Sequence, residues 1–310
     1  MGRAEKRNII PSKRMSEFKE GGAVYVVRCM INKCPCGKPH LNNCGRGFFS
    51  LFIQAIYGIR FADWIQIPYN INFSNGRYLY SDFRSDGNEN FWNYYFDQPL
   101  KALREYDRPV INLYNEVHPL RIWSRTFFND IYQSVIQKLK YQPEVKAILD
   151  DTKKRFEGYH VLGVHFRGTD HPGEIPPVGL EKYLAEVDKR IKHVDRLFLA
   201  TDEQYIVDLF SDKYGDKLIV NEVVRSLNSE AVHANLQISD RYQLGLDALV
   251  DCYSLSLCTS AILTHSNLSY AAMFFNPGLK YKLMERWQPK VKRFKTLILY
   301  YLDKWGIRKW

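Results

Sequence analysis

The second half of the chain alternates short apolar runs with longer amphipathic stretches. The apolar runs lie at 160–166, 196–201, 217–220, 261–264 and 280–284. The stretches between them, at 179–194, 202–214 and 241–258, repeat apolar residues at helical spacing. Strands that alternate with helices of this length are typical of a parallel sheet covered on both faces. The pattern therefore predicts a Rossmann-like α/β domain over 157–288.

The first half has a less regular pattern but begins in the same way. It predicts a strand at 23–28, a glycine-rich turn entering a helix within 45–64, a strand at 64–69, and helices near 124–140 and 143–156. Residues 72–100 are rich in aromatic and polar residues and predict a loop region that lines a groove. We therefore expect an α/β protein of two Rossmann-like domains facing a cleft, 1–156 and 157–288, followed by a C-terminal helix at 289–310.

The net charge of the chain limits the classes of partner that it could bind, but it does not distinguish among those classes. The 310 residues are 45% hydrophobic and 25% charged, as in ordinary globular proteins, and the net charge is +10. Such a basic chain suits nucleic acid, a phosphorylated small molecule or an anionic membrane surface. No signal-like segment and no window apolar enough to span a bilayer is evident, so we expect a cytoplasmic protein.

The C-terminal segment carries part of this charge. Residues 288–310 predict a basic helix with apolar and aromatic residues on one side. A helix docked on the protein and a helix that contacts a membrane surface both fit this pattern. A helix of the second kind would make an anionic membrane a partner of the protein and would hold the protein peripherally at the inner face of that membrane.

A cysteine-rich loop follows the first strand. It holds four cysteines and a histidine, at Cys29, Cys34, Cys36, His40 and Cys44. The spacing matches no standard zinc motif, so a structural metal, one or two disulfides and reduced thiols all stay open.

Polar side chains follow three of the predicted strands at the point where each strand ends. The three groups are His165, Arg167, Thr169 and Asp170; Thr201, Asp202 and Glu203; and His265, Ser266 and Asn267. Ligands of open parallel sheets bind beyond the carboxyl ends of the strands. Three such ends predict a binding site there.

The residue types at these ends fit a phosphate. Arg167 offers a permanent charge and a planar fork of donors. Ser266 and Asn267 open a short helix whose free N–H groups could hold a second phosphate oxygen. A structural ion pair is the alternative for Arg167, and plain N-capping is the alternative for Ser266 and Asn267.

Two carboxylates interrupt the apolar pattern of 241–258. Asp247 and Asp251 are four residues apart and share one face of the predicted helix. A carboxylate aimed into a cleft could accept the N1–H and N2–H groups of guanine. The alternatives are a solvated helix face and a buried salt bridge. The chain has no P-loop, no GxGxxG and no Asp-x-Asp motif, which disfavours kinases and dehydrogenases.

Taken in order, the motifs "VHFRGTD", "LFLATDE" and "GLDALVDCYSLSLCTSAILTHSNLS" resemble the GDP-fucose-dependent fucosyltransferases, most closely the α-1,6 type. The resemblance covers about 157–285, and weakly 45–58. It implies a GT-B-like fold and a donor site in which Arg167 binds the β-phosphate of GDP. It places His165 and Asp251 at the guanosine end, Ser266 and Asn267 on phosphate, and Asp202 in the turn after the second strand. One position departs: Gly168 stands where the family has a second arginine.

Together with these residues, the resemblance implies an inverting glycosyltransferase that needs no divalent metal and no cofactor beyond its donor, GDP-fucose. Arg167 would stabilise the leaving diphosphate, and Glu174 or Asp170, with His171 third, would take the proton of the acceptor hydroxyl. The acceptor would be a cell-surface polysaccharide or a lipid-linked glycan. The acceptor-binding candidates of the N-terminal half are Arg46, Trp92, Tyr94 and Tyr95.

Two alternatives remain at this stage. Another GDP- or UDP-sugar could replace GDP-fucose in the same architecture. A nucleic-acid-binding protein would explain the basic charge and the aromatic residues, but Lys and Arg are spread along the chain or concentrated in its tail.

Overall fold

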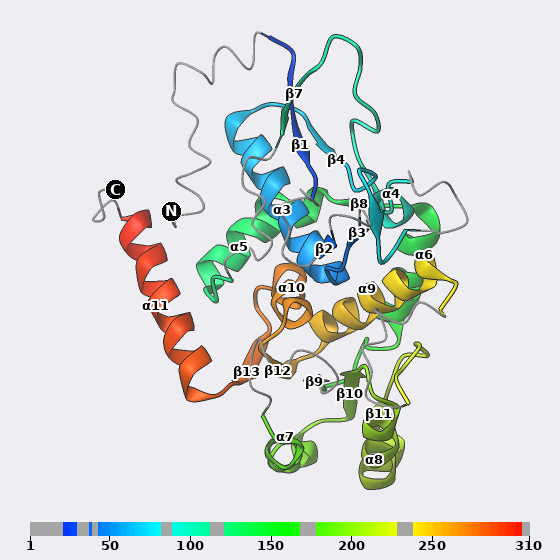
Figure 1. Ribbon diagram of the computed structural model, residues 1–310. Coiled ribbons are helices and arrows are strands. Elements are labelled where there is room, and N and C mark those ends of the chain that lie inside the picture. The colour runs from blue at the N-terminus through cyan, green and yellow to red at the C-terminus, as the bar shows by residue number, and fades with distance from the viewer. Residues whose placement is uncertain are drawn as a thin grey trace. The chain divides into compact units, whose positions relative to one another are not determined.

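The computed structural model describes residues 21–29, 37–38, 43–81, 89–111, 121–167, 178–227 and 238–305. These residues form two compact units, each with its own parallel sheet (Figure 1). Unit 1 comprises Met1–Gln142 together with Arg293–Trp310, and unit 2 comprises Pro143–Lys292. The fold is therefore α/β, as the alternating pattern predicts.

Unit 1 is built on a three-stranded parallel sheet in the order β4-β1-β7. The strands are β1 (Ala23–Val27), β4 (Tyr69–Ile71) and β7 (Arg108–Ile111). Helix α3 (Phe48–Ile65) packs closely on β1. A Cβ atom at Gly58 would lie 2.2 Å from Val27 Cγ2, so only glycine allows this close approach. Smaller elements complete the unit: β2 (Gly37–Lys38), β3 (Asn43–Cys44), β5 (Arg77–Tyr78), α4 (Trp92–Tyr95), β6 (Phe96–Asp97), α5 (Arg125–Ser134), η3 (Ile136–Lys138) and β8 (Lys140–Tyr141).

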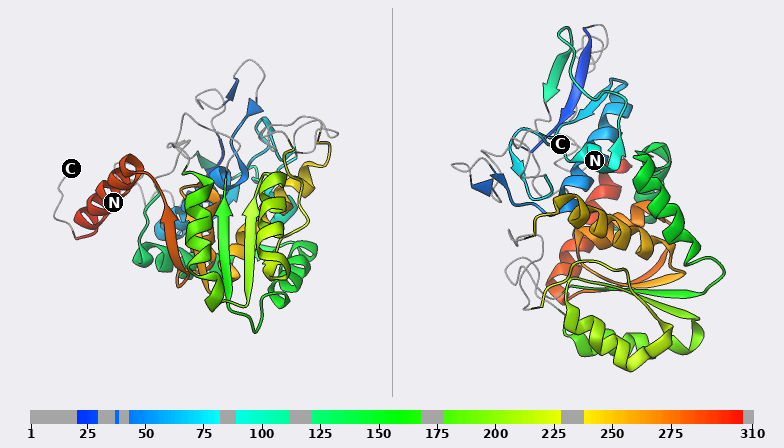
Figure 2. Two further views of the ribbon diagram at one scale, coloured as in Figure 1. Left: turned by 90° about the horizontal axis from the view of Figure 1, so that it is seen from below. Right: turned by 90° about the vertical axis from the view of Figure 1, so that its right-hand side faces the viewer.

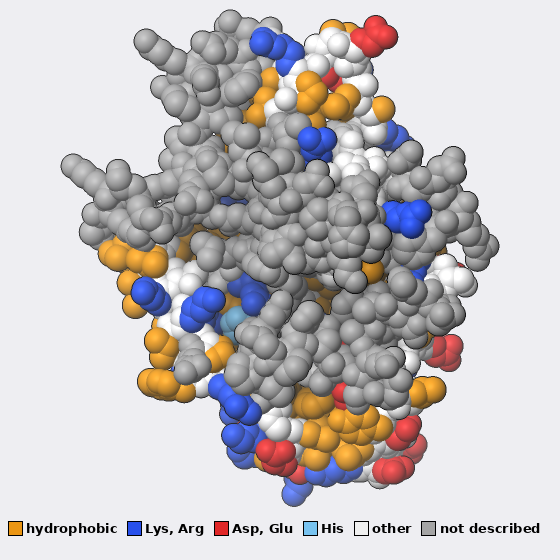
Figure 3. All heavy atoms as spheres, viewed as in Figure 1, with side chains coloured by type: hydrophobic (Ala, Val, Ile, Leu, Met, Phe, Trp, Pro, Cys, Tyr) orange, Lys and Arg blue, Asp and Glu red, His pale blue; other side chains and the backbone are white. Residues whose placement is uncertain are grey.

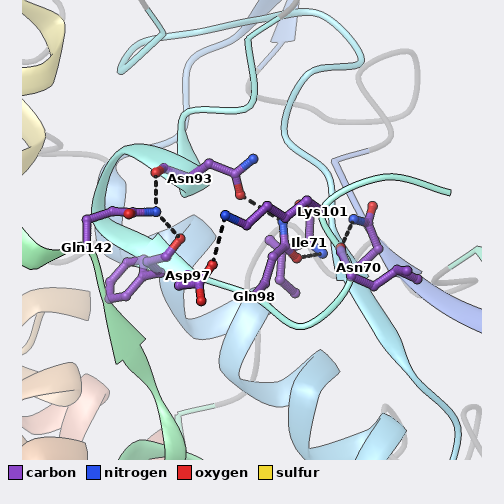
Figure 4. Close-up of polar contacts among 9 residues, drawn as sticks. Asn70, Ile71, Asn93, Asp97, Gln98, Lys101 and Gln142 are labelled. Carbon is purple, nitrogen blue, oxygen red and sulfur yellow. Dashed lines mark hydrogen bonds and ion pairs between the residues drawn. The ribbon is translucent and has the colours of Figure 1, made fainter.

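Buried amide side chains attach the aromatic segment of unit 1 to the edge strand β4 (Figure 4). Gln98 accepts a hydrogen bond from Ile71 N at 2.7 Å and donates to Ile71 O at 3.1 Å and to Asn93 Oδ1 at 2.9 Å. Gln142 donates to Asn93 O at 2.9 Å. These side chains satisfy the backbone groups of an edge strand, where an unpaired edge would invite association. The same bonds fix the short helix α4, which begins at Trp92.

Helix α3 differs from the sequence-based expectation in two ways. It continues to Ile65 and ends at Gln66 in the left-handed conformation (φ 57°), so the strand expected at 64–69 begins only at Tyr69. Among the described residues, α3 is also the one helix long and apolar enough to cross a membrane, although no such window was expected. Within the structure, 72% of that window is buried, as in a core helix.

Unit 2 is a five-stranded parallel sheet in the order β11-β10-β9-β12-β13. Its strands are β9 (Val161–Phe166), β10 (Arg196–Thr201), β11 (Leu218–Ile219), β12 (Ser260–Thr264) and β13 (Lys280–Met284). Its helices are α6 (Pro143–Lys154), α7 (Leu180–Asp188), η4 (Ile191–His193), α8 (Gln204–Tyr214), η5 (Gly215–Lys217), α9 (Arg241–Leu257) and α10 (Asn267–Phe275). Figure 2 shows α7 and α8 on one face of this sheet and α9 on the other.

The division between the units differs from the predicted boundary after residue 156. Helix α6 belongs to unit 2, because Arg155, just beyond its end, donates to Asn221 Oδ1 at 2.9 Å and to Val220 O at 3.1 Å. The last helix, α11 (Trp287–Lys304), forms no separate domain. Its C-terminal half belongs to unit 1, where the Tyr300 ring packs 5.6 Å from that of Phe127 on α5.

Candidate functional site

The strand order of unit 2 creates a switch point between β9 and β12. From β9 the chain adds β10 and β11 on one side and then crosses through α9 to add β12 and β13 on the other. The chain order of the strands therefore reverses between β9 and β12, and such a point of an open parallel sheet is where doubly wound folds bind ligands. The predicted polar groups lie at this edge of the sheet.

His165, on β9, contacts the start of α10, the helix that follows β12. Its Nδ1 lies 2.7 Å from Ser269 Oγ and 3.4 Å from Ser266 Oγ, at the start of α10. The ring is 5% exposed. Burial, and then the charge of Arg167, lowers the pKa of His165 to about 3, so the imidazole is neutral at physiological pH. Through this contact β9 fixes the position of the α10 N-terminus.

The alternative for Ser266, N-capping, is what the structure shows. Ser266 is the N-cap of α10 and accepts a hydrogen bond from Ser269 N at 3.2 Å. Asn267 is the first residue of the helix and is half-buried. A cap of this kind holds the first turn so that the remaining N–H groups face outward along the helix axis, toward which an anion is attracted.

Arg167 is the first residue after β9 and is half-buried. It lies close enough to His165 for its charge to lower the pKa of that ring. The residues that follow it, including the predicted Asp170, His171 and Glu174, lie outside the described part of the chain. The side of the site that the structure describes thus combines one arginine with the capped end of α10.

Asp251 lies deep at the other side of the same edge, on α9. It accepts a hydrogen bond from Asn221 Nδ2 at 2.8 Å, and Asn221 also donates to Ser254 Oγ at 3.1 Å. Burial raises the pKa of Asp251 to about 7, although the hydrogen bond from Asn221 and the charge of Arg225 oppose this shift. The carboxyl group is therefore half-protonated near neutral pH, a state typical of functional carboxylates.

Asp247 is also buried, so the alternative of a solvated helix face is wrong for both carboxylates. Val224 N donates to Asp247 Oδ2 at 3.2 Å, and Gln243 donates to its Oδ1 at 2.6 Å. Burial raises the pKa of Asp247. Asp247 thus holds the segment after β11 in place, while Asp251 is bonded to Asn221.

The second predicted strand end, at Asp202, lies close enough to Asp251 for the two charges to interact. Asp202 follows β10, and its charge contributes to the raised pKa of Asp251. The segment after β11 folds back over it: Ser226 N donates to Asp202 O at 2.8 Å, and Gln204 N donates to Ser226 O at 3.0 Å. The carboxyl edge of the sheet therefore has a basic end at β9 and α10 and an acidic end at β10 and α9.

Three residues of this site were not predicted. Asn221, Ser254 and Ser269 bond directly to Asp251 or His165, or to a residue that does so. Asn221 follows the strand pattern "KLIV", so it is a fourth polar strand end that the three-strand count omitted. Ser254 lies one turn after Asp251 on the same helix face, and helical spacing could have found it.

In unit 1, the predicted acceptor residues have packing partners. Arg46 is 4% exposed and donates to Ser50 Oγ at 3.0 Å and to Ser50 O at 2.8 Å, and it also bonds to Gln54, which fixes the first turns of α3. Trp92 is 2% exposed, and its ring stacks 4.2 Å from that of Phe96.

Tyr95 is fully buried, like Trp92, and belongs to the same aromatic core. A buried ring has no face to offer a sugar, so Trp92 and Tyr95 have a core role here. Tyr94 is half-buried, with its hydroxyl 2.7 Å from Glu89 Oε2, and it stays a candidate for acceptor binding.

Of the cysteine loop, the structure describes Cys29 and Cys44. Both are buried free thiols whose Sγ atoms lie 3.5 Å apart. The hydrogen bond from Cys44, aided by the charge of Arg46, lowers the pKa of Cys29 to about 7. No group of three metal-ligating side chains occurs among the described residues, and Cys34, Cys36 and His40 lie outside them.

Comparison with known proteins identifies solved structures of similar fold. No family model matches the chain, and no curated protein matches it. A crystal structure of the α-1,6-fucosyltransferase NodZ soaked with GDP-fucose does match, with a TM-score of 0.51 and 14% identity over 84% of this chain and 94% of that one. The chain is similar in fold to NodZ. This likeness confirms the α/β fold that the sequence resemblance implied.

Two further structures match at lower scores. NodZ from Bradyrhizobium matches with a TM-score of 0.46 and 14% identity, over 81% of this chain and 91% of that one. POFUT1 in complex with GDP-fucose matches with a TM-score of 0.37 and 9% identity, over 88% of this chain and 79% of that one.

Proposed function

We propose that the chain is an inverting glycosyltransferase that moves fucose from GDP-fucose to a hydroxyl of a cell-surface or lipid-linked glycan, in the cytoplasm and without a divalent metal. The observation that carries this proposal is the group of His165, Arg167 and the Ser266-capped end of α10 at the switch point of a doubly wound sheet. The fold shared with NodZ, whose crystals were soaked with GDP-fucose, supports the same donor.

The basic end of the edge suits the diphosphate. Negative charge builds on the departing GDP as the glycosidic bond breaks, and fixed donors that meet this charge lower the barrier. Arg167 would supply a permanent charge and two hydrogen bonds, and the N-terminal N–H groups of α10 would add partial positive charge. Neutral His165, which the resemblance places at the guanosine end, would here hold the start of α10 in position through its contacts with Ser266 and Ser269. This supply of charge is why we propose that no metal is required.

The acidic end suits guanine. A carboxylate at Asp251 would accept the N1–H and N2–H groups of the base, a pair that uracil does not offer. Asn221 would hold this carboxylate in position through its 2.8 Å bond. Asp202, beside Asp251, would lie near the ribose. The spacing of the two ends along the sheet edge would then match a nucleotide lying across several strands.

The acceptor hydroxyl would attack the sugar from the face opposite the diphosphate, which inverts the anomeric centre. Its proton must pass to a base, for which Glu174, Asp170 and His171 are the candidates. Unit 1, with Tyr94 as its remaining predicted contact, would bind the glycan.

Calorimetric titration of GDP, GDP-fucose, GDP-mannose, UDP and UMP with EDTA present tests the donor site. We expect micromolar binding of GDP and GDP-fucose that Arg167→Ala weakens by about a hundredfold, since a charge-assisted bidentate contact contributes about 3 kcal/mol. Arg196→Ala is the matched control, because Arg196 begins β10 at the opposite edge of the sheet. It should bind GDP as the wild type does.

A second pair of variants tests the proposed recognition of guanine by Asp251. Asp251→Asn should lower the preference for GDP over UDP, whereas Asp247→Asn, with its carboxyl group committed to Val224 and Gln243, should keep that preference. Tighter binding of UDP than of GDP by the wild type would indicate a UDP-sugar as the donor in place of GDP-fucose. Failure of every nucleotide to bind would refute the donor site and favour salt-dependent nucleic-acid binding.

A further inference from the structure

Helix α11 and Trp305, the residue that follows it, carry a row of exposed apolar side chains. The members and their exposed fractions are Trp287 at 74%, Val291 at 47%, Phe294 at 46%, Ile298 at 58% and Trp305 at 66%. They are spaced at i, i+4, i+7, i+11 and i+18, so they project from one line along the helix. We call this row the α11 stripe. Because α11 has 18 residues, the stripe runs along a helix about 27 Å long.

The C-terminal half of α11 is anchored through residues outside the stripe. Tyr300 is 7% exposed, with its ring 5.6 Å from that of Phe127. The Tyr301 hydroxyl lies 2.7 Å from Ser124 Oγ, at the cap of α5. Docking on unit 1 therefore accounts for the apolar residues Tyr300 and Tyr301 and leaves the stripe exposed. Both alternatives considered for this segment can thus hold at once, on different faces of one helix.

Basic residues alternate with the stripe. Lys290, Lys292, Arg293 and Lys295 lie within its first half, and the sequence has no acidic residue between Glu285 and Asp303. The Arg293 guanidinium lies over the Phe294 ring, 4.7 Å from its centroid. Figure 3 shows hydrophobic and basic side chains side by side where α11 lies at the lower left of Figure 1. A face with this mixture attracts an anionic surface and inserts apolar groups into it.

We propose that the α11 stripe binds the surface of an anionic lipid bilayer, with the helix lying parallel to the membrane plane. The stripe would enter the boundary between headgroups and acyl chains, and the lysines beside it would contact lipid phosphates. The tryptophans at its two ends have the amphipathic rings that favour this depth. A second copy of the chain would bring the same basic residues against one another, and the net charge of +10 on each copy opposes that contact.

Vesicle co-sedimentation of the full chain tests this proposal. Wild-type protein should bind vesicles of phosphatidylcholine mixed with phosphatidylglycerol and should bind pure phosphatidylcholine vesicles at least about tenfold more weakly. The triple variant Trp287→Ser, Phe294→Ser and Ile298→Ser should lose about tenfold or more in binding to the mixed vesicles. Lys290→Glu with Lys295→Glu should lose at least about fivefold per residue, and added salt should reduce the wild-type binding in the same direction.

The matched control removes exposed apolar rings elsewhere. Trp64→Ser with Tyr106→Ser deletes side chains that are 51% and 69% exposed, and it should bind the vesicles as the wild type does. Circular dichroism and thermal melting of each variant establish that it is folded. The readout involves no nucleotide, so it stands or falls separately from the proposed transferase activity.

Three results would overturn the proposal. Mixed-vesicle binding that the folded triple variant retains would show that the stripe is not the contact. Equal binding to both kinds of vesicle would remove the role of the basic residues. A wild-type dimer in sedimentation equilibrium that the triple variant dissociates, without vesicle binding, would assign the stripe to a second copy.

Discussion

Burial of the Asp251 carboxyl group lowers the free energy of unfolding at neutral pH. Its pKa is about 7, raised by burial from an ordinary 3.8. The unfolded chain ionises this carboxyl group near pH 4, whereas the folded chain holds its proton up to neutral pH. The folded state is therefore penalised progressively as the pH rises from about 4 to 7, and the full penalty applies above pH 7. Proteins keep such groups where function requires them.

The variant Asp251→Asn removes this penalty while keeping an oxygen that can accept the Asn221 hydrogen bond. We expect it to be more stable than the wild type at pH 8 by about 1–3 kcal/mol, and by clearly less at pH 5. Urea unfolding followed by circular dichroism at both pH values measures the difference. A stability gain that is the same at pH 5 and pH 8 would show that ionisation of Asp251 is not its source.

The same pKa predicts how guanine binding depends on pH, if the proposed function holds. Only the ionised carboxylate accepts both guanine N–H groups, so affinity should rise as the pH passes through about 7. Between pH 6 and pH 8 the gain should be about tenfold, because the ionised fraction of a group with a pKa of about 7 rises from roughly 0.09 to roughly 0.91. Guanosine is the probe, because it has no phosphate to titrate. Asp251→Asn should show a flat profile, and a flat wild-type profile would contradict the assignment.

At the scale of elements, β9 and α9 lie close together at Gly163, where the strand has no side chain. A Cβ atom at Gly163, in the middle of β9, would lie 2.8 Å from Cys258 Sγ and 3.2 Å from Leu255 Cδ2. Both neighbours lie at the end of α9, so Gly163 sets the distance between this helix and the sheet. The position of Asp251 on the same helix depends on that distance.

Gly163→Ala should therefore lower the free energy of unfolding by about 1–3 kcal/mol through overpacking. Cys258→Ala removes the nearest atom, so the double variant should recover much of this loss. A double-mutant cycle from chemical denaturation measures the coupling. Additive effects of the two substitutions would show that the contact does not limit the packing of α9.

The elements of unit 2 could be predicted because each follows a clear period, of two for strands and 3.6 for helices. Parallel topology then forces residues such as His165 and Asp202 to the same edge, so the site was predictable from the strand ends. The aromatic segment was not predictable in this way. Trp92 and Tyr95 lie in the core, and a sequence rich in aromatic residues reads the same for a core as for a groove.

The sequence pattern also did not predict where some elements and units end. The strand expected at 64–69 begins only at Tyr69, because "ADWI" completes α3 and Gln66 then ends the helix. The unit boundary moved to Gln142–Pro143 because Arg155 bonds to residues after β11, a contact between distant parts of the chain. Local patterns contain no record of such long-range contacts.

At the scale of the whole molecule, the chain has two compact units with separate sheets and cores. Calorimetry should show two unfolding transitions, and GDP should raise only the one that belongs to unit 2. At a GDP concentration a hundred times the dissociation constant, the stabilisation should be about 2.7 kcal/mol. Gly163→Ala identifies the unit 2 transition by lowering it. A GDP-induced shift of the other transition instead would place the nucleotide site in unit 1.

The discontinuity of unit 1 has a consequence for how the protein is made. Unit 2 is continuous and can fold on the ribosome as soon as it emerges, whereas unit 1 needs Arg293–Trp310, which is synthesised only after the whole of unit 2. Helix α3 contacts α5 through Tyr57 and Phe127, and Tyr300 of α11 covers the same Phe127 ring. Helix α5, which packs on the long apolar helix α3, thus acquires its contact with Tyr300 only after unit 2 has been synthesised. Nascent unit 1 should be a substrate for ribosome-associated chaperones, and truncation before α11 should send the chain to aggregates or to the membrane insertion machinery.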